Sequence, residues 1–298
     1  MKKNVYLSLS ALLVLLAAIT ILKLRSSQDN SENSLNAKTP AEKERITRFW
    51  EIYREATDQR LVGKTKEAAE GYRNALALND KHEDALYYLG NLCVELADYK
   101  TAEEAWRRLA HVNPHSARAH LQLGDLYLNF EQKEFFSLDK AEEEFQNALK
   151  INQEETGPVL RLGHIALIRG DLPKAQHYFD AVIATNFKSV EAHFLNGYIS
   201  WKTGNPAQAK KMFSAAVKHS AAEKPVQSVL SEGDTKSGRA HTLPETSKRR
   251  TLFQPFIGDL AGLEESSLPQ QMQARYRKLA ALLQQMKNEP AVAVTPHL

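Results

Sequence analysis

Apolar residues recur along the central part of the chain with the spacing of amphipathic helices, interrupted by short polar turns. Turn sequences such as Gly170-Asp171-Leu172-Pro173 separate successive helical stretches. The pattern predicts the first helices of five hairpins near residues 49–62, 83–96, 117–130, 156–169 and 190–203, and their second helices near 65–78, 99–112, 138–151, 172–185 and 206–219.

The predicted hairpins share one register of small and aromatic residues. The series Ala68, Ala102, Ala141, Ala175 and Ala209 is spaced by 34, 39, 34 and 34 residues, and the series Tyr72, Trp106, Phe145, Phe179 and Phe213 repeats these four intervals. Five extra residues therefore lie between Gly124 and Ala141, where a turn is expected. Since no single hairpin can bury its apolar face alone, units that repeat in this way are predicted to stack.

This register resembles the tetratricopeptide repeat, a 34-residue helix-turn-helix with a Leu-Gly pair in its first helix and an alanine–aromatic–alanine series in its second. The matching pairs are Leu89-Gly90, Leu123-Gly124 and Leu162-Gly163, with Asn196-Gly197 a partial match and Ala56 in place of the glycine in the first unit. The resemblance covers roughly residues 49–222. It implies an all-α, right-handed superhelical solenoid of about five units, over residues 45–222.

The resemblance also implies a binding groove, because unit positions 2, 5, 9 and 12 usually face the concave side in this family. Counted from Val190, the last unit places an aromatic stripe at these positions. An aromatic stripe at helical spacing is also typical of a core, and a further alternative is that the C-terminal tail covers Trp201. The groove is expected to bind a partner protein or peptide through Tyr87, Asn91, Arg118, Asp125, His164, Phe194, Tyr198 and Trp201.

The N-terminal residues predict a membrane anchor. Lys2 and Lys3 precede an uncharged apolar run over residues 5–22, which is about the shortest length that spans a bilayer as a helix. The run is longer than the apolar core of a cleaved signal peptide, so an uncleaved anchor over residues 1–25 is favoured over cleavage. The positive-inside bias places the solenoid on the exported, periplasmic side of a bacterial inner membrane. Residues 26–44 are expected to form a flexible tether.

The chain changes character again after the repeats. Residues 223–266 are predicted to be a mostly disordered linker, within which the apolar patch at 251–263 is expected to dock. An amphipathic helix is predicted at 267–289, before a tail at 290–298. Its apolar seam contains Met272, Tyr276, Leu279, Leu283 and Met286. This helix is expected to cap the last repeat, to form a homo-oligomer through residues 268–286, or to lie in the groove as a ligand of its own chain.

Composition and motifs argue against catalysis and against nucleic acid. The net charge is only +3, without the concentrated basic face of a nucleic-acid-binding protein. Cys93 is the single cysteine and the histidines lack metal-ligand spacing, so no metal site and no cofactor are expected. The sequence therefore predicts a membrane-anchored scaffold, an envelope assembly or quality-control factor rather than an enzyme. The alternative is a structural homo-oligomer driven by the C-terminal helix, with the groove occupied by its own tail.

Overall fold

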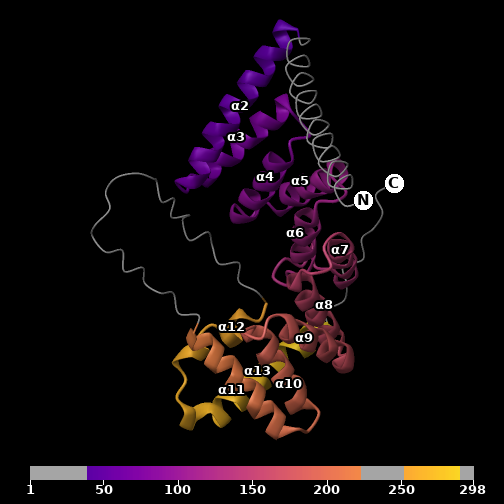
Figure 1. Cartoon of the computed structure of the whole chain (residues 1–298), viewed down its shortest axis with the longest axis vertical. Helices are drawn as coiled ribbons and strands as arrows, with labels where there is room; N and C mark the ends of the chain where they lie inside the picture. The colour runs from indigo at the N-terminus through magenta and orange to yellow at the C-terminus, as the bar shows by residue number, and fades with distance from the viewer. Residues whose placement is uncertain (1–38, 223–251, 289–298) are drawn as a thin grey trace, which may run out of the picture.

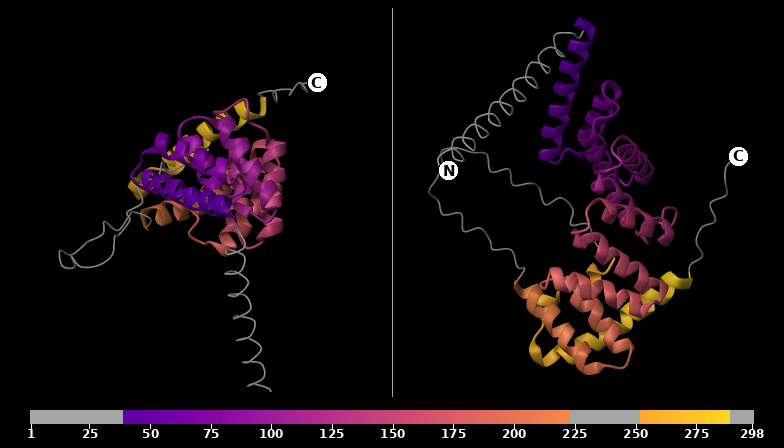
Figure 2. Two further views of the ribbon diagram at one scale, coloured as in Figure 1. Left: turned by 90° about the horizontal axis from the view of Figure 1, so that it is seen from above. Right: turned by 45° about the vertical axis from the view of Figure 1, so that its right-hand side comes forward.

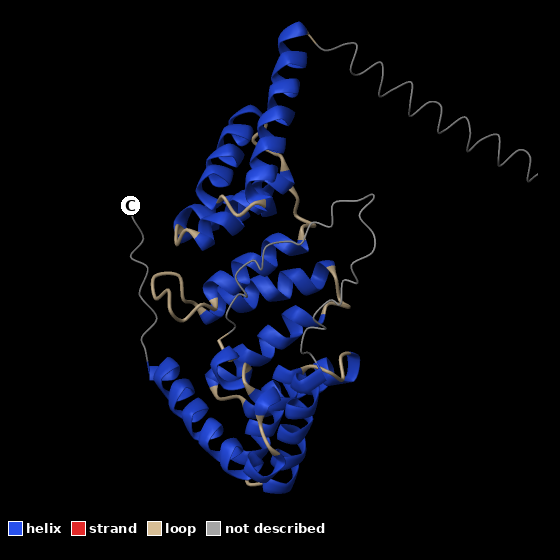
Figure 3. Cartoon of the chain, turned by 90° about the vertical axis from the view of Figure 1, so that its left-hand side faces the viewer, coloured by secondary structure: helices blue, strands red, loops and turns tan. Residues whose placement is uncertain are grey.

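The chain folds into a stack of helix pairs that follow one another along the molecule (Figure 1). The computed structural model describes residues 39–222 and 252–288, and within these two ranges all regular structure is helical (Figure 3). The five pairs are α2 (Pro40–Leu61) with α3 (Thr65–Leu78), α4 (Glu83–Glu95) with α5 (Tyr99–Val112), α6 (Ala117–Tyr127) with α7 (Leu138–Ile151), α8 (Thr156–Arg169) with α9 (Leu172–Thr185), and α10 (Val190–Lys202) with α11 (Pro206–Ala222). The predicted hairpins are confirmed, and four second helices have the predicted bounds.

Each second helix packs against its own first helix, and α3, α5, α7 and α9 also pack against the first helix of the next unit. The first and second helices of a pair approach closely because a glycine faces an aromatic ring. A Cβ added at Gly124 would lie 2.6 Å from the Phe145 ring, and one added at Gly163 would lie 2.5 Å from Phe179. In the first unit the roles are exchanged, because Gly71 of α3 faces Ala56 of α2. Ala56 thus departs from the repeat pattern without opening the helix pair.

The third unit carries the extra residues that break the period. Its first helix was expected to reach residue 130, but α6 ends at Tyr127 and the chain forms an irregular loop up to Ser137. Phe130 and Phe136 pack edge to face at 5.4 Å within this loop, and the Ser137 amide donates to the Tyr127 carbonyl at 2.8 Å. The insertion therefore closes on itself and leaves the stacking of α6 and α7 intact.

The N-terminal helix is longer than the repeat predicts. Helix α2 begins at Pro40 because Thr39 and Glu42 form a reciprocal capping box at its first turn. The expectation of a tether over residues 26–44 is therefore wrong for residues 40–44, which are helical. The predicted anchor at 1–25 and the remainder of the tether lie outside the described residues. In the two ranges that the structure does describe, no helix is long and apolar enough to cross a bilayer.

A second compact element follows the solenoid. It consists of α12 (Gln254–Ile257), the 3-10 turns η1 (Leu260–Gly262) and η2 (Glu265–Ser267), and α13 (Leu268–Asn288). Residues 252–288 are termed the C-terminal segment. The prediction of a mostly disordered linker is wrong for residues 252–266, because their apolar side chains are buried: Phe253, Phe256, Ile257 and Leu260. The predicted seam of α13 is buried as well, whereas residues 223–251 and the tail lie outside the described ranges.

Candidate partner-binding face

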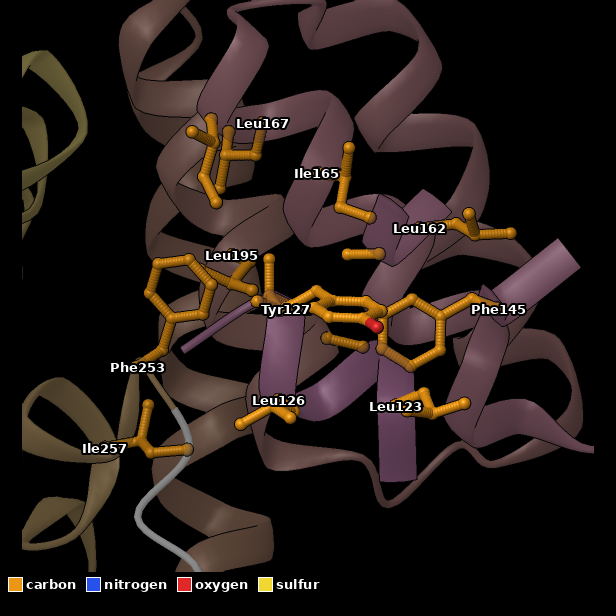
Figure 4. Close-up of a cluster of buried hydrophobic side chains, with 14 of the residues drawn as sticks. Leu123, Leu126, Tyr127, Phe145, Leu162, Ile165, Leu167, Leu195, Phe253 and Ile257 are labelled. Carbon is orange, nitrogen blue, oxygen red and sulfur yellow. The ribbon is translucent and has the colours of Figure 1, made fainter. Parts of the chain in front are cut away.

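The surface formed by unit positions 2, 5, 9 and 12 of the first helices is termed the first-helix face. Over the last two units the C-terminal segment lies on this face and also against the second helix α11 (Figure 2). Helix α13 packs against α8 and α11, η1 packs against α11, and α12 packs against α10. Phe253 and Ile257 enter the same cluster of buried side chains as Leu195 and Tyr127 of the solenoid (Figure 4). The segment is therefore part of the folded core.

Tyr276 of α13 is the central contact of the docked segment. Its ring lies 5.2 Å from Phe194, 5.7 Å from Tyr198 and 5.9 Å from Trp201. Its hydroxyl donates to the Phe194 backbone carbonyl at 3.2 Å, and burial raises the pKa of this hydroxyl far above its ordinary value. A Cβ added at Gly197 would overlap the hydroxyl. In the third and fourth units the equivalent glycine contacts an aromatic ring of its own hairpin, whereas Gly197 contacts Tyr276 of α13.

The segment also covers His164 on α8. The Phe253 ring packs edge to face on the imidazole with centroids 4.7 Å apart, and the side chain is only 1% exposed. Burial lowers the pKa of His164, while Glu191, whose carboxylate lies 3.3 Å from Nε2, partly opposes that shift. His164 is thus held as a neutral imidazole beneath the segment at neutral pH.

Arg275 braces the segment internally. Its guanidinium forms two bonds to the Asp259 carboxylate, at 2.7 and 2.9 Å, and a third to the Phe256 carbonyl at 2.8 Å. These hydrogen bonds lower the pKa of Asp259. Because α13 and the α12 turn are joined in this way, the segment presents its apolar side chains as one surface.

Four of the eight predicted groove residues therefore contact the chain's own C-terminal segment or lie beneath it. His164, Phe194 and Tyr198 are buried and Trp201 is half-buried. These four side chains lie beside one occupant of the face. That occupant is residues 252–288, and with these residues docked His164, Phe194 and Tyr198 are not available to another protein, whereas Trp201 stays partly exposed.

The other four predicted residues lie on α4 and α6 and remain half-buried: Tyr87, Asn91, Arg118 and Asp125. Arg118 forms an ion pair with Asp84 at 2.6 Å and lies over the Tyr87 ring, 4.8 Å from its centroid. Asp125 accepts from Arg161 at 2.8 Å. The first-helix face of the first three units is thus polar and aromatic, with its carboxylates already paired.

Aromatic side chains continue this face onto α2. Trp50 is 47% exposed, and its ring lies 5.7 Å from Tyr53 and 5.5 Å from His82. A cavity of about 270 Å³ adjoins Trp50 and Phe49, and burial raises the pKa of Tyr53 to about 12. An exposed tryptophan in an aromatic cluster is typical of a contact surface. The eight predicted groove residues do not include this end of the face, nor do they include Arg60, although Arg60 occupies the same unit position as Trp201.

The described residues contain no group of three or more histidine, cysteine or carboxylate side chains arranged to hold a metal. Cys93 is buried, and this burial raises the pKa of its thiol to about 11, so it is protonated at neutral pH. His120 is paired with Glu144 at 2.6 Å across two helices. These groups stabilise the solenoid rather than forming a reactive site.

Comparison with known proteins finds a known repeat in part of the chain. Residues 94–154 and 160–225 match the sequence profile of the tetratricopeptide repeat family. A crystal structure of MamA protein is similar in fold, with 20% identity, a TM-score of 0.51, and coverage of 63% of this chain and 98% of that chain. A MamA structure from Desulfovibrio magneticus RS-1 gives 15% identity and a TM-score of 0.51, covering 58% of this chain and 96% of that chain.

A curated relative is similar over a shorter stretch. BBSome complex member BBS4 of Bos taurus is 29% identical over 135 residues, which is 44% of this chain and 25% of that protein. The chain thus spans about a quarter of the length of the curated relatives it matches. None of these matches indicates an enzyme family. Within the stack of helix pairs, residues 94–154 and 160–225 thus match the tetratricopeptide repeat, whose fold is suited to protein–protein interaction.

Proposed function

We propose that the chain is a scaffold that binds a partner protein on the first-helix face of its first three units. One observation carries this proposal. At these positions in the last two units, His164, Phe194 and Tyr198 are buried against the chain's own C-terminal segment. The same positions of the first three units, apart from the buried Leu128, remain partly exposed and include the aromatic rings of Trp50, Tyr53 and Tyr87. A partner helix or extended peptide that occupied the open positions would continue the same mode of contact.

Site-specific photo-crosslinking tests this proposal. A photoreactive amino acid replaces Tyr87 on α4, and in a matched control it replaces Glu104, which is exposed on the second helix α5. The expected result is a discrete protein adduct from position 87 that is missing from position 104. Adding Trp50→Ala should weaken that adduct. Equal adducts from both positions, or none from position 87, would show that the partner binds elsewhere.

We further propose that residues 5–22 anchor the scaffold in a bacterial inner membrane, with the solenoid on the exported side, where it acts in envelope assembly or quality control. The support is the apolar run preceded by two lysines. Membranes are extracted with alkaline carbonate and then treated with protease from either side. Retention in the membrane, loss of retention on deletion of residues 1–25, and protection of the solenoid from protease on the cytoplasmic side are expected. Release by carbonate would contradict the anchor.

A further inference from the structure

Arg60 lies near the end of α2, at unit position 12 of the first repeat, and is half-buried. Its Nε donates to the Tyr72 hydroxyl at 3.3 Å, and its guanidinium carbon lies 4.1 Å from the centroid of the Tyr88 ring. The planar group is therefore stacked on one tyrosine and hydrogen-bonded to another. Both contacts fix its orientation, which is how arginine is pre-organised for bidentate recognition.

The hydrogen bonds around Arg60 can be followed donor by donor. Thr57 donates its only hydroxyl proton to the Tyr53 carbonyl at 2.8 Å. The Tyr72 hydroxyl, 3.0 Å from Thr57 Oγ1, must then donate to it and accept from Arg60 Nε. This series of hydrogen bonds uses only the Nε proton of Arg60. The two terminal NH₂ groups of Arg60 have no hydrogen-bond partner among the described residues.

The other half-buried arginines of the described ranges are paired with carboxylates: Arg118 with Asp84 at 2.6 Å, Arg161 with Asp125 at 2.8 Å, and Arg275 with Asp259 at 2.7 Å. Arg60 is the exception. On the first-helix face of the first three units, the pairing of Arg118 and Arg161 also neutralises both acidic positions, so Arg60 carries the remaining positive charge. A partly desolvated cation of this kind favours an incoming anion.

The last unit shows where an occupant of the face passes. Trp201, at the same unit position as Arg60, lies 5.9 Å from the Tyr276 ring of the docked α13. An occupant that ran along the open half in the same way would pass Arg60 and the neighbouring Tyr53 and Tyr88. Position 12 is thus a contact point for whatever lies on this face.

We propose that Arg60 binds an aspartate or glutamate side chain of the partner, so that the scaffold recognises an acidic peptide segment. This inference rests on the proposed function, because it concerns the same open face. A carboxylate matches the two free NH₂ groups of one guanidinium. A phosphorylated segment fits less well, since phosphate recognition uses clusters of cations and the nearby Arg118 is already paired with Asp84.

The test uses the full-length chain and an array of short peptides, acetylated and amidated so that side chains supply the only carboxylates. Each glutamate peptide has a twin in which glutamine replaces glutamate. Binders are then measured by fluorescence polarisation against wild type, Arg60→Gln and Arg60→Lys. Arg277→Gln, which removes the same charge from an exposed position on α13, is the matched control. Circular dichroism checks that each variant keeps its helix content.

The expected result is coupling between the two charges. Replacing glutamate in the peptide, or Arg60 in the protein, should each weaken binding by about tenfold or more, and the second change should add little to the first. Arg60→Lys should recover part of the loss, and Arg277→Gln should bind as wild type does. If glutamate and glutamine peptides bind equally well but Trp50→Ala or Tyr87→Ala abolishes binding, the inference fails and the proposed function stands. If no peptide responds to any of these substitutions, both fail.

Discussion

One turn position of the repeat requires a left-handed backbone, and an alanine occupies it in the second unit. This position lies one or two residues beyond the end of the first helix and has a φ of 77° at Gly63, 84° at Gly170 and 80° at Gly204, whereas Ala97 adopts 59°. A Cβ in this conformation crowds the following carbonyl. We predict that Ala97→Gly stabilises the chain by about 0.5–1 kcal/mol, measured by urea unfolding.

The reverse change supplies the control for Ala97→Gly. A Cβ added at Gly63 would meet no atom within 4 Å, so Gly63→Ala tests the backbone conformation without a clash. It should destabilise the chain by about 1 kcal/mol. If both substitutions left the free energy of unfolding unchanged, backbone strain at this turn would be negligible.

Gly197 and the Tyr276 hydroxyl occupy adjoining space, which predicts a rescue. Gly197→Ala should displace α13, because its new methyl group would overlap that hydroxyl. Tyr276→Phe alone should cost about 1 kcal/mol for the lost bond to the Phe194 carbonyl. Since the phenylalanine lacks the overlapping atom, the double variant should hold α13 better than Gly197→Ala alone.

Limited proteolysis of the C-terminal segment measures how firmly α13 is held in each of these variants. The single Gly197→Ala variant should be cut fastest within residues 252–288, and the double variant more slowly. Gly163→Ala, which crowds Phe179 inside its own hairpin, has no such rescue and serves as the control. Additive effects of the two changes would mean that Gly197 and Tyr276 do not share this contact.

At the scale of elements, the docking of the C-terminal segment on α8 is predicted to weaken in acid. Burial lowers the pKa of His164 below its ordinary 6.5, opposed by Glu191 and assisted by Arg161, with Asp125 also raising it. Undocking removes the Phe253 ring and returns the imidazole toward water. The undocked state therefore binds a proton more readily, so docking is complete above pH 6.5 and weakens as the pH falls through and below that value.

Hydrogen exchange of residues 252–263, followed as a function of pH, measures this effect locally. Local measurement matters because burial also lowers the pKa of His82, far from this segment in the first two units. After correction for the intrinsic pH dependence of exchange, protection should fall in acid for wild type. His164→Gln should remove that dependence. Protection that is equally pH-dependent in the variant would exclude His164 as its origin.

The elements themselves were largely predictable, because the repeat constrains them twice. The interval between units and the spacing of apolar residues within each helix must agree in every unit. Because both constrain the helix ends, α3, α5, α7 and α9 have the predicted bounds. The first turns of α2 were missed because the Thr39–Glu42 capping box extends that helix beyond the repeat. The end of α6 was missed because the insertion after Tyr127 has no equivalent in the other units.

The sequence predicted the first-helix face better than it predicted the segment that covers this face. Register places Phe194, Tyr198 and Trp201 side by side, since helical geometry alone decides this. It cannot decide what covers them, because Tyr276 comes from a distant segment whose seam fits a coiled coil equally well. The omission of Arg60 was avoidable, because Arg60 occupies the same unit position as Trp201.

At the scale of the whole molecule, the solenoid has two unlike halves. The C-terminal half is closed by a segment that contributes its own aromatic and aliphatic core, and the N-terminal half presents Trp50, Tyr87 and Arg60. Solenoid repeats need a terminal element that covers their last apolar face. The C-terminal segment supplies that cover, so the seam of α13 is already used within one chain.

This use of the seam makes a prediction opposite to that of a homo-oligomer driven by α13. In the oligomer hypothesis, removing the C-terminal residues converts a dimer to a monomer. With Met272, Tyr276 and Leu283 buried against the same chain, a fragment of residues 39–298 should sediment as a monomer. A fragment of residues 39–222 should instead expose Phe194 and Tyr198 and should self-associate or lose stability in its last unit. The substitution Leu283→Asp in the longer fragment should shift it toward the behaviour of the truncated one. A concentration-dependent dimer of residues 39–298 that disappears on truncation would establish the oligomer, and it would require the segment to be exchanged between two chains.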